Sequence, residues 1–155
     1  SSVTFSGLGA YSDYKHLQIR YTARCSEAFS TGSIYIHANG DTAANYSAHY
    51  LRGNGSAVSS AAFTSTSTPY LATMVGSLAA SGAFASGVID ILDFTNANKN
   101  TTFRALSGVD YPSSSAWIRL ASALWNNTAA VTSMTLEPQG LTLITGSRFS
   151  LYGVK

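Results

Sequence analysis

A strict alternation of apolar and polar residues between Tyr14 and Cys25 most constrains the fold of this chain. The apolar side chains fall on every second position, at Leu17, Ile19, Tyr21, Ala23 and Cys25. Successive side chains of an extended strand point to opposite faces, so this pattern predicts a strand with one buried face. Cys25 is the single cysteine of the chain and shares the buried phase. We therefore expect a buried structural thiol and no intramolecular disulfide.

The C-terminal stretch from Trp125 to Lys155 shows the same period. Thr132, Met134 and Leu136 alternate with Val131, Ser133 and Thr135, and a turn is predicted at 137–140. Leu141 and Leu143 open a second run, and 149–154 forms a third. Because free termini are normally polar and frayed, apolar residues this close to the chain end predict a strand tied into a sheet. We expect the fold to close there.

Further short strands are predicted at 2–5, 34–38, 48–52, 87–94, 101–107 and 116–122, with Ser113–Ser115 separating the last two. The run at 87–94 has apolar residues on both faces, which is typical of a strand covered on both sides. The segment 57–69 suits a long loop or an edge strand, since Pro69 argues against a central strand. The segment 70–86 has no clean period. Its apolar residues would also suit a helical turn, which Gly76 and Gly82 disfavour.

Short strands spaced by about a dozen residues favour antiparallel order. The fold class predicted is therefore all-β, an antiparallel β-sandwich of jelly-roll type with little helix, formed by residues 1–155 as a single domain. The residues expected to supply the core are Leu17, Ile19, Tyr21, Ile34, Ile36, Ile89, Ile91, Leu120, Met134, Leu136, Phe149 and Leu151.

Charge is scarce in this chain. Charged residues make up 10%, against about 25% in an average protein. The net charge is +2 without any basic run, which argues against a nucleic-acid partner. No apolar run approaches the ~20 residues of a membrane span, which argues against membrane insertion. A surface with few charges repels neighbours weakly and favours self-association, although serine and threonine would also solvate a monomer.

The sequence contains no arrangement typical of catalysis. G-x-S-x-G, H-E-x-x-H and phosphate-binding glycine loops are all missing from it, and the three histidines are expected to be solvated or hydrogen-bonded. Asp90 and Asp93 leave opposite faces of a strand, so they cannot act as a carboxylate pair. If Asp90 is buried it needs an arginine partner such as Arg104 or Arg119. We expect no enzyme activity and no cofactor.

Two weaker candidates for binding remain. Asn39-Gly40-Asp41 and Asn45 offer several oxygens near a turn, as calcium sites do, but turn formation alone explains these residues and no metal is expected. Tyr46, Tyr50, Tyr70 and Tyr111 lie near predicted turns. Their rings could stack on sugars or on a protein neighbour, or could finish the core.

The order of motifs along the chain resembles a group of tailed-bacteriophage virion proteins. The matching blocks are 3–8 (VTFSGL), 14–24 (YKHLQIRYTAR), 39–47 (NGDTAANYS), 125–136 (WNNTAAVTSMTL) and 146–154 (GSRFSLYGV). The group has a further strand that we would expect before Ser1. The resemblance implies a structural protein on the exterior of a virion and carries over no catalytic residues.

Two functions without catalysis follow from this resemblance. In the first, the chain is a capsid decoration or cement protein that assembles as a homo-oligomer, with a homotrimer expected, and contacts other virion proteins. In the second, it is a tail-fibre or appendage domain that binds host-surface glycans. A glycan-degrading enzyme is third, because the sequence shows no acid pair.

Overall fold

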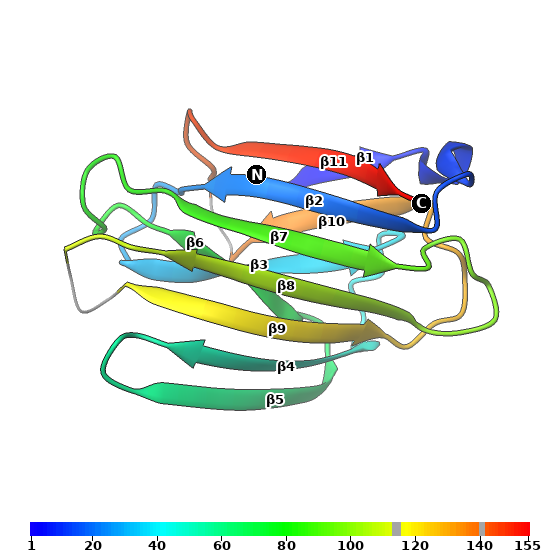
Figure 1. Ribbon diagram of the computed structural model, residues 1–155, viewed down its shortest axis with the longest axis horizontal. Coiled ribbons are helices and arrows are strands. Elements are labelled where there is room, and N and C mark those ends of the chain that lie inside the picture. Colours follow the sequence, from blue (N-terminus) through cyan, green and yellow to red (C-terminus); the bar gives the residue numbers. More distant parts are fainter. Residues whose placement is uncertain (113–115, 140–141) are drawn as a thin grey trace.

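The computed structural model describes residues 1–112, 116–139 and 142–155, which form two antiparallel β-sheets (Figure 1). The strands are β1 (Val3–Ser6), β2 (His16–Ala23), β3 (Thr31–Ala38), β4 (Tyr46–Gly53), β5 (Val58–Thr66), β6 (Tyr70–Val75), β7 (Ala85–Leu92), β8 (Thr101–Val109), β9 (Trp117–Trp125), β10 (Ser133–Pro138) and β11 (Arg148–Val154). A short 3-10 helix, η1 (Leu8–Tyr11), follows β1. The all-β sandwich is therefore confirmed, while the finer jelly-roll expectation stays a prediction.

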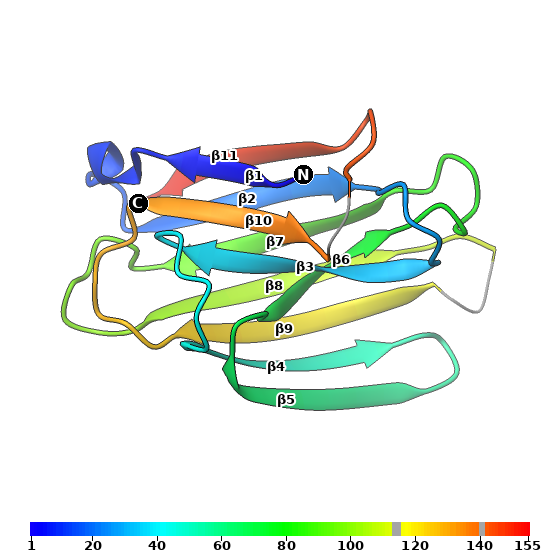
Figure 2. The same ribbon diagram turned by 180° about the vertical axis from the view of Figure 1, so that it is seen from behind.

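The two sheets differ in width. One has four strands in the order β1-β10-β3-β6, and the other has seven in the order β11-β2-β7-β8-β9-β4-β5. Figure 2 shows the narrow sheet in front, with β4 and β5 lying beyond its edge. The inner side chains at that end of the wide sheet are therefore less covered, and Tyr50, Arg52 and Phe63 are only half-buried.

The core lies between the sheets and follows the predicted alternation. In β2, Leu17, Ile19 and Tyr21 are buried while the residues between them are more exposed. Cys25 is 1% exposed, which confirms the buried thiol. Most of the predicted core residues are buried, and Phe149 and Leu151 are partly buried against the same cluster.

Leu120 was predicted to be a core residue, and this prediction is wrong because its side chain is 50% exposed. In β9 the opposite phase faces the core, where Arg119, Ala121 and Ala123 are buried. The prediction that 87–94 is covered on both faces is also wrong for the isolated chain. Ile89 and Ile91 are fully buried, but the other face of β7 is only partly covered.

The uncertain middle of the chain is extended. Residues 58–66 form β5, an edge strand that pairs with β4, as one of the two alternatives predicted. Residues 70–75 form β6, so the helical alternative is wrong there. Glu137 and Pro138, which were predicted to belong to the turn at 137–140, are instead the last residues of β10 and pair with β3. Gly140, Leu141 and Ser113–Ser115 lie outside the described residues.

The C-terminal strand β11 is the outermost strand of the wide sheet and pairs with β2 alone. Phe149 stacks on Tyr21, its register partner, with ring centroids 5.5 Å apart. The other C-terminal strand, β10, lies inside the narrow sheet between β1 and β3. The end of the chain therefore contributes one strand to each sheet.

Candidate functional site

The outer face of the wide sheet carries an unusual concentration of aliphatic side chains. Val88, Leu106, Leu120 and Leu51 are successive register partners across β7, β8, β9 and β4. Ile118 and Val58 continue the row, since both are register partners of Gly53. We call these six residues the apolar strip. Its members are 50–73% exposed, except Val88, which is half-buried.

A polar row borders the strip. Asp90 accepts hydrogen bonds of 2.9 Å from Gln18 Nε2 and 2.8 Å from Arg104 Nη2. The bond from Gln18 and the Arg104 guanidinium hold the pKa of Asp90 below its ordinary value, although partial burial opposes them. Arg104, one of the two arginines predicted from the sequence, is therefore confirmed as the partner of Asp90. Asp90 and Arg104 therefore satisfy one another's charge. Arg20 of β2, the register partner of Val88, is a further exposed charge at the β7 end of the strip.

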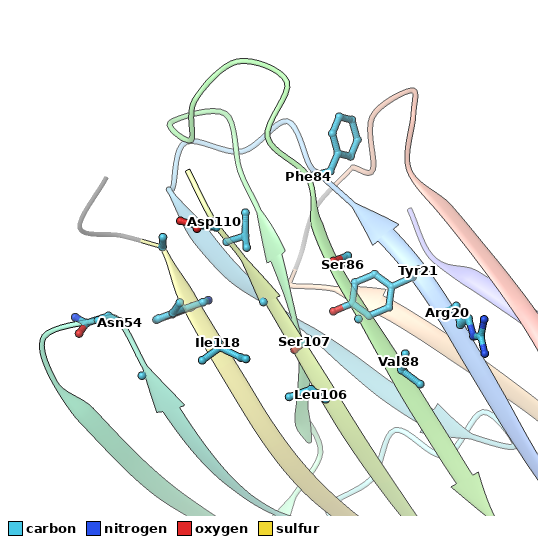
Figure 3. Close-up of a pocket in the computed structure, with 17 residues that line it drawn as sticks. Arg20, Tyr21, Asn54, Phe84, Ser86, Val88, Leu106, Ser107, Asp110 and Ile118 are labelled. Atoms are coloured by element: carbon cyan, nitrogen blue, oxygen red, sulfur yellow. The ribbon is translucent and has the colours of Figure 1, made fainter. Parts of the chain in front are cut away.

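A shallow depression of about 800 Å³ lies alongside the strip (Figure 3). Val88, Leu106 and Ile118 line it from neighbouring strands, and Phe84 lies at its upper end in the figure. Part of its floor is bare backbone, because the outward positions there in β8 and β4 are the glycines Gly108 and Gly53. The combination of projecting aliphatic residues and a hollow suits an interlocking protein partner.

A second concentration of unusual side chains lies on the inner side of the wide sheet, where the narrow sheet ends. It consists of Arg52, Arg119, Trp117, Tyr50 and Phe63 from the wide sheet and Tyr70 from β6 of the narrow sheet, and we call it the Arg-aromatic cluster. The Arg52 Cζ lies 4.3 Å from the Trp117 ring centroid, and the Arg119 Cζ lies 4.6 Å from that of Tyr50. Phe63 links Tyr50 to Tyr70, with centroid distances of 6.1 and 5.0 Å.

Arg119 is the most constrained member of this cluster. It is 3% exposed, and its Nη1 donates to Ser33 Oγ at 3.0 Å and to the Ala72 carbonyl at 3.5 Å. Burial lowers the pKa of the Arg119 guanidinium below its ordinary value, and the Arg52 charge acts in the same direction. Nearby tyrosines oppose this shift. The guanidinium is thus held chiefly by neutral groups.

The four predicted tyrosines lie in three different environments. Tyr50 and Tyr70 come together in the Arg-aromatic cluster, both half-buried. Tyr46 is 1% exposed, and its hydroxyl donates to the Asp41 carbonyl and accepts from the Ala38 N–H. The Tyr46 ring is therefore not available to a ligand. Tyr111 is half-buried and packs against a small separate cluster around Val75.

The turn at Asn39–Asp41 is held by the protein itself. Asp41 Oδ2 accepts from Trp125 Nε1 at 2.8 Å and from Asn45 Nδ2 at 2.9 Å, while Oδ1 accepts from the Ala43 N–H. Asn39 Oδ1 accepts from the N–H groups of Thr132 and Ser133. These contacts explain the turn without a metal ion.

The remaining titratable groups form no composite site in the described part of the chain. His16 Nδ1 accepts from the Asp93 N–H, His37 Nε2 bonds the Ser67 carbonyl, and His49 is exposed. Among the described residues, no three His, Cys, Asp or Glu side chains lie close enough to hold a metal ion. Residues 1–112, 116–139 and 142–155 include no helix long and apolar enough to cross a membrane.

Both surfaces contain residues that the sequence pattern did not single out. Leu51, Leu106 and Ile118 of the apolar strip, and Arg52 and Trp117 of the cluster, were not predicted to be functional. Arg52 and Tyr50 share a phase in β4, as Trp117 and Arg119 do in β9. This alternation is the only feature of the sequence that could have indicated the cluster. Only the register of β4 and β9 shows that Tyr50 and Arg52 lie beside Trp117 and Arg119.

Comparison with protein-family models, curated proteins and solved structures finds no match to this chain.

Proposed function

We propose that this chain is a non-enzymatic structural protein of a bacteriophage virion, which assembles as a homo-oligomer on the exterior of the particle. Three copies are the expected number, and other virion proteins are the further partners. The resemblance of the ordered sequence motifs to tailed-phage virion proteins supports the setting. Assembly is supported by the shape and chemistry of the wide sheet.

The observation that carries this proposal is the apolar strip. Leu51, Leu106 and Leu120 are aligned on adjacent strands and are each about half exposed. Contiguous exposed aliphatic surface of this kind marks protein interfaces, because burial against a partner removes it from water. A second copy of the chain is the occupant that fits, since the strip and its neighbouring depression offer projecting and hollow parts on the same face. An interface above ~1,000 Å² is expected, the usual size for specific contacts.

Light scattering after size-exclusion chromatography tests the assembly. Leu106→Glu and Leu120→Glu each place a charge in the strip, where burial in an interface would be costly. We expect the unaltered chain to form an oligomer and both variants to be folded monomers that still melt cooperatively, with a melting temperature lowered only by the loss of the interface. Leu78→Glu is the control, because Leu78 is 67% exposed in the loop between β6 and β7 and should leave the oligomer intact. A monomeric unaltered chain would contradict the proposal.

The number of copies per particle distinguishes the two places on the virion. Quantitative mass spectrometry of purified particles should give hundreds of copies for a head decoration protein and a handful for a tail appendage. We favour the head decoration, because a charge-poor surface suits permanent packing in a lattice.

A second candidate function is glycan binding by a tail appendage. The Arg-aromatic cluster favours it, since the half-buried rings of Tyr50, Tyr70 and Trp117 could stack on sugar rings. A glycan array with the isolated domain tests this alternative, and retention by Tyr50→Ala at the level of the unaltered chain would contradict it.

A further inference from the structure

Two arginines face each other across neighbouring strands, and no carboxylate of the described residues pairs with either of them. Arg52 in β4 and Arg119 in β9 are direct register partners, and their side chains share the inner face of the sheet. Like charges directly opposite each other destabilise a sheet, and the effect is larger where water is excluded. Arg119 is 3% exposed, so its charge is removed from solvent. Cation-π contacts with Tyr50 and Trp117 offset part of this cost.

Hydrogen-bond donors in the same place lack acceptors. In the described part of the chain, Arg119 Nε and Trp117 Nε1 are both buried without a hydrogen-bond partner. Arg52 Nε donates to Ser59 Oγ at 2.9 Å, a neutral acceptor. Buried polar groups are normally satisfied, so an anionic acceptor at this place would both bond these donors and offset the charge of the two guanidinium groups.

The described part of the chain does not supply a negative charge to this pair. Within the described residues, no carboxylate oxygen lies within 4.0 Å of either guanidinium, and the ion pairs found join other residues. Asp90 is occupied by Arg104 and Asp41 by Trp125. The five residues outside the description are serines, a glycine and a leucine, so they contribute no acidic side chain.

We propose that the half-buried Arg52 binds the carboxylate of an acidic sugar, such as a hexuronic acid unit of a polysaccharide, and that the charge of the buried Arg119 beside it strengthens the attraction. A planar carboxylate matches the fork of a guanidinium group and would neutralise the repulsion between the two arginines. The rings of Tyr50 and Trp117 beside them suit the apolar face of a pyranose ring. An inorganic phosphate would satisfy the charges but would leave these rings unused. The site does not depend on assembly through the apolar strip, and it deepens the glycan-binding alternative by naming the charge of the sugar.

Titration calorimetry on the complete chain tests this site with three probes at equal ionic strength: sodium glucuronate, glucose and sodium acetate. We expect glucuronate to bind at least roughly tenfold more tightly than glucose, as loss of one charge-assisted contact would predict. Added sodium chloride should weaken the binding. Equal binding of glucose would overturn the role of the charge while leaving general glycan binding supported. Equal binding of acetate would overturn the role of the sugar ring.

One variant and its matched control test whether glucuronate binds at Arg52. Arg52→Gln removes a half-buried charge and relieves the repulsion, so it should fold normally and lose glucuronate binding by about tenfold or more. Arg20→Gln is the control, because Arg20 is exposed on the outer face and stacks over Tyr152 at 5.1 Å in a similar way. It should bind glucuronate like the unaltered chain. Unchanged binding by Arg52→Gln, or no saturable binding of glucuronate at all, would overturn the proposal. Loss of the oligomer in Arg52→Gln would instead identify a carboxylate of a neighbouring copy as the ligand.

Discussion

The indole Nε1 of Trp125 donates a hydrogen bond of 2.8 Å to the carboxylate of Asp41, which lies 84 positions earlier in the chain. Trp125 is the last residue of β9 and Asp41 lies in the turn between β3 and β4, so this bond joins the strand to the turn. Asp41 also accepts a hydrogen bond from Asn45, which lies just before β4. Trp125 itself is 1% exposed, so its N–H has little access to water. The Asp41 side chain therefore anchors one end of the wide sheet.

We expect Asp41→Ala to lower the free energy of unfolding by about 1–3 kcal/mol, the cost of leaving a buried donor without an acceptor. Chemical denaturation measures this change. Asp13→Ala is the control, since Asp13 is exposed in the loop before β2 and should have little effect. An unchanged denaturation midpoint for Asp41→Ala would show that water replaces the carboxylate at no cost.

The same carboxylate predicts a dependence of stability on pH. The hydrogen bonds from Trp125 and Asn45 lower the pKa of Asp41 below its ordinary value of 3.8. A carboxyl group with a lowered pKa in the folded state stabilises the fold above its unfolded pKa and loses that contribution as pH falls through the folded pKa. We therefore expect the difference in stability between the unaltered chain and Asp41→Asn to shrink below about pH 4. Denaturation midpoints measured from pH 7 to pH 2 check this, and a constant difference would contradict it.

Truncation of a core residue and of a surface residue should have very different effects on the free energy of unfolding. Ile89 is fully buried in β7, and Ile89→Ala should cost about 2–5 kcal/mol, because it leaves a cavity. Leu120 is 50% exposed in β9, and Leu120→Ala should change the stability of the isolated monomer by no more than about 0.5 kcal/mol. Equilibrium denaturation compares the two. A small cost at Ile89 would mean that the centre of the core lies elsewhere.

The sequence predicts the strands well but not the phase of every strand. In β2 large apolar residues occur in one phase only, so the buried face is unambiguous. In β9 both phases contain large apolar residues, and residue size favours Leu120 over Ala121 as the core residue. The structure has the reverse because Ala121 and its register partner Ala105 face the interior, where Trp125, Tyr46 and Phe103 supply the volume.

The candidate sites were less predictable than the fold, for a physical reason. Leu51, Leu106 and Leu120 come from three strands, and only their register makes them a continuous surface. Arg52 and Arg119 lie far apart in the chain, and no local pattern indicates that they face each other. Tyr50 and Tyr70 were predicted as candidates, but the sequence gives no indication that Phe63 connects them.

The hydrogen bonds of the Asn39–Asp41 turn predict that removal of metal ions by a chelator leaves the stability of the protein unchanged. The carboxylate oxygens of Asp41 and the amide oxygen of Asn39 already accept hydrogen bonds from protein donors, so the turn forms without a cation. We expect the melting temperature to be the same with and without EDTA, because we expect no metal-binding energy to contribute to folding. A fall of several degrees that added calcium reverses would contradict this and would direct attention to the same turn.

The last strand is expected to be essential. Deleting 149–155 removes most of β11, including Phe149, which stacks on the buried Tyr21, and Leu151, which packs on the core. It also uncovers β2, whose backbone groups would lose their partners and form a new exposed edge. We expect aggregation or failure to fold, measured by the soluble yield and by the cooperativity of thermal melting. Deletion of Lys155 alone is the control, because this residue lies beyond β11 and should be dispensable. A truncated chain that stays soluble and melts cooperatively would show that β11 is an accessory strand and that β2 can serve as the edge of the sheet.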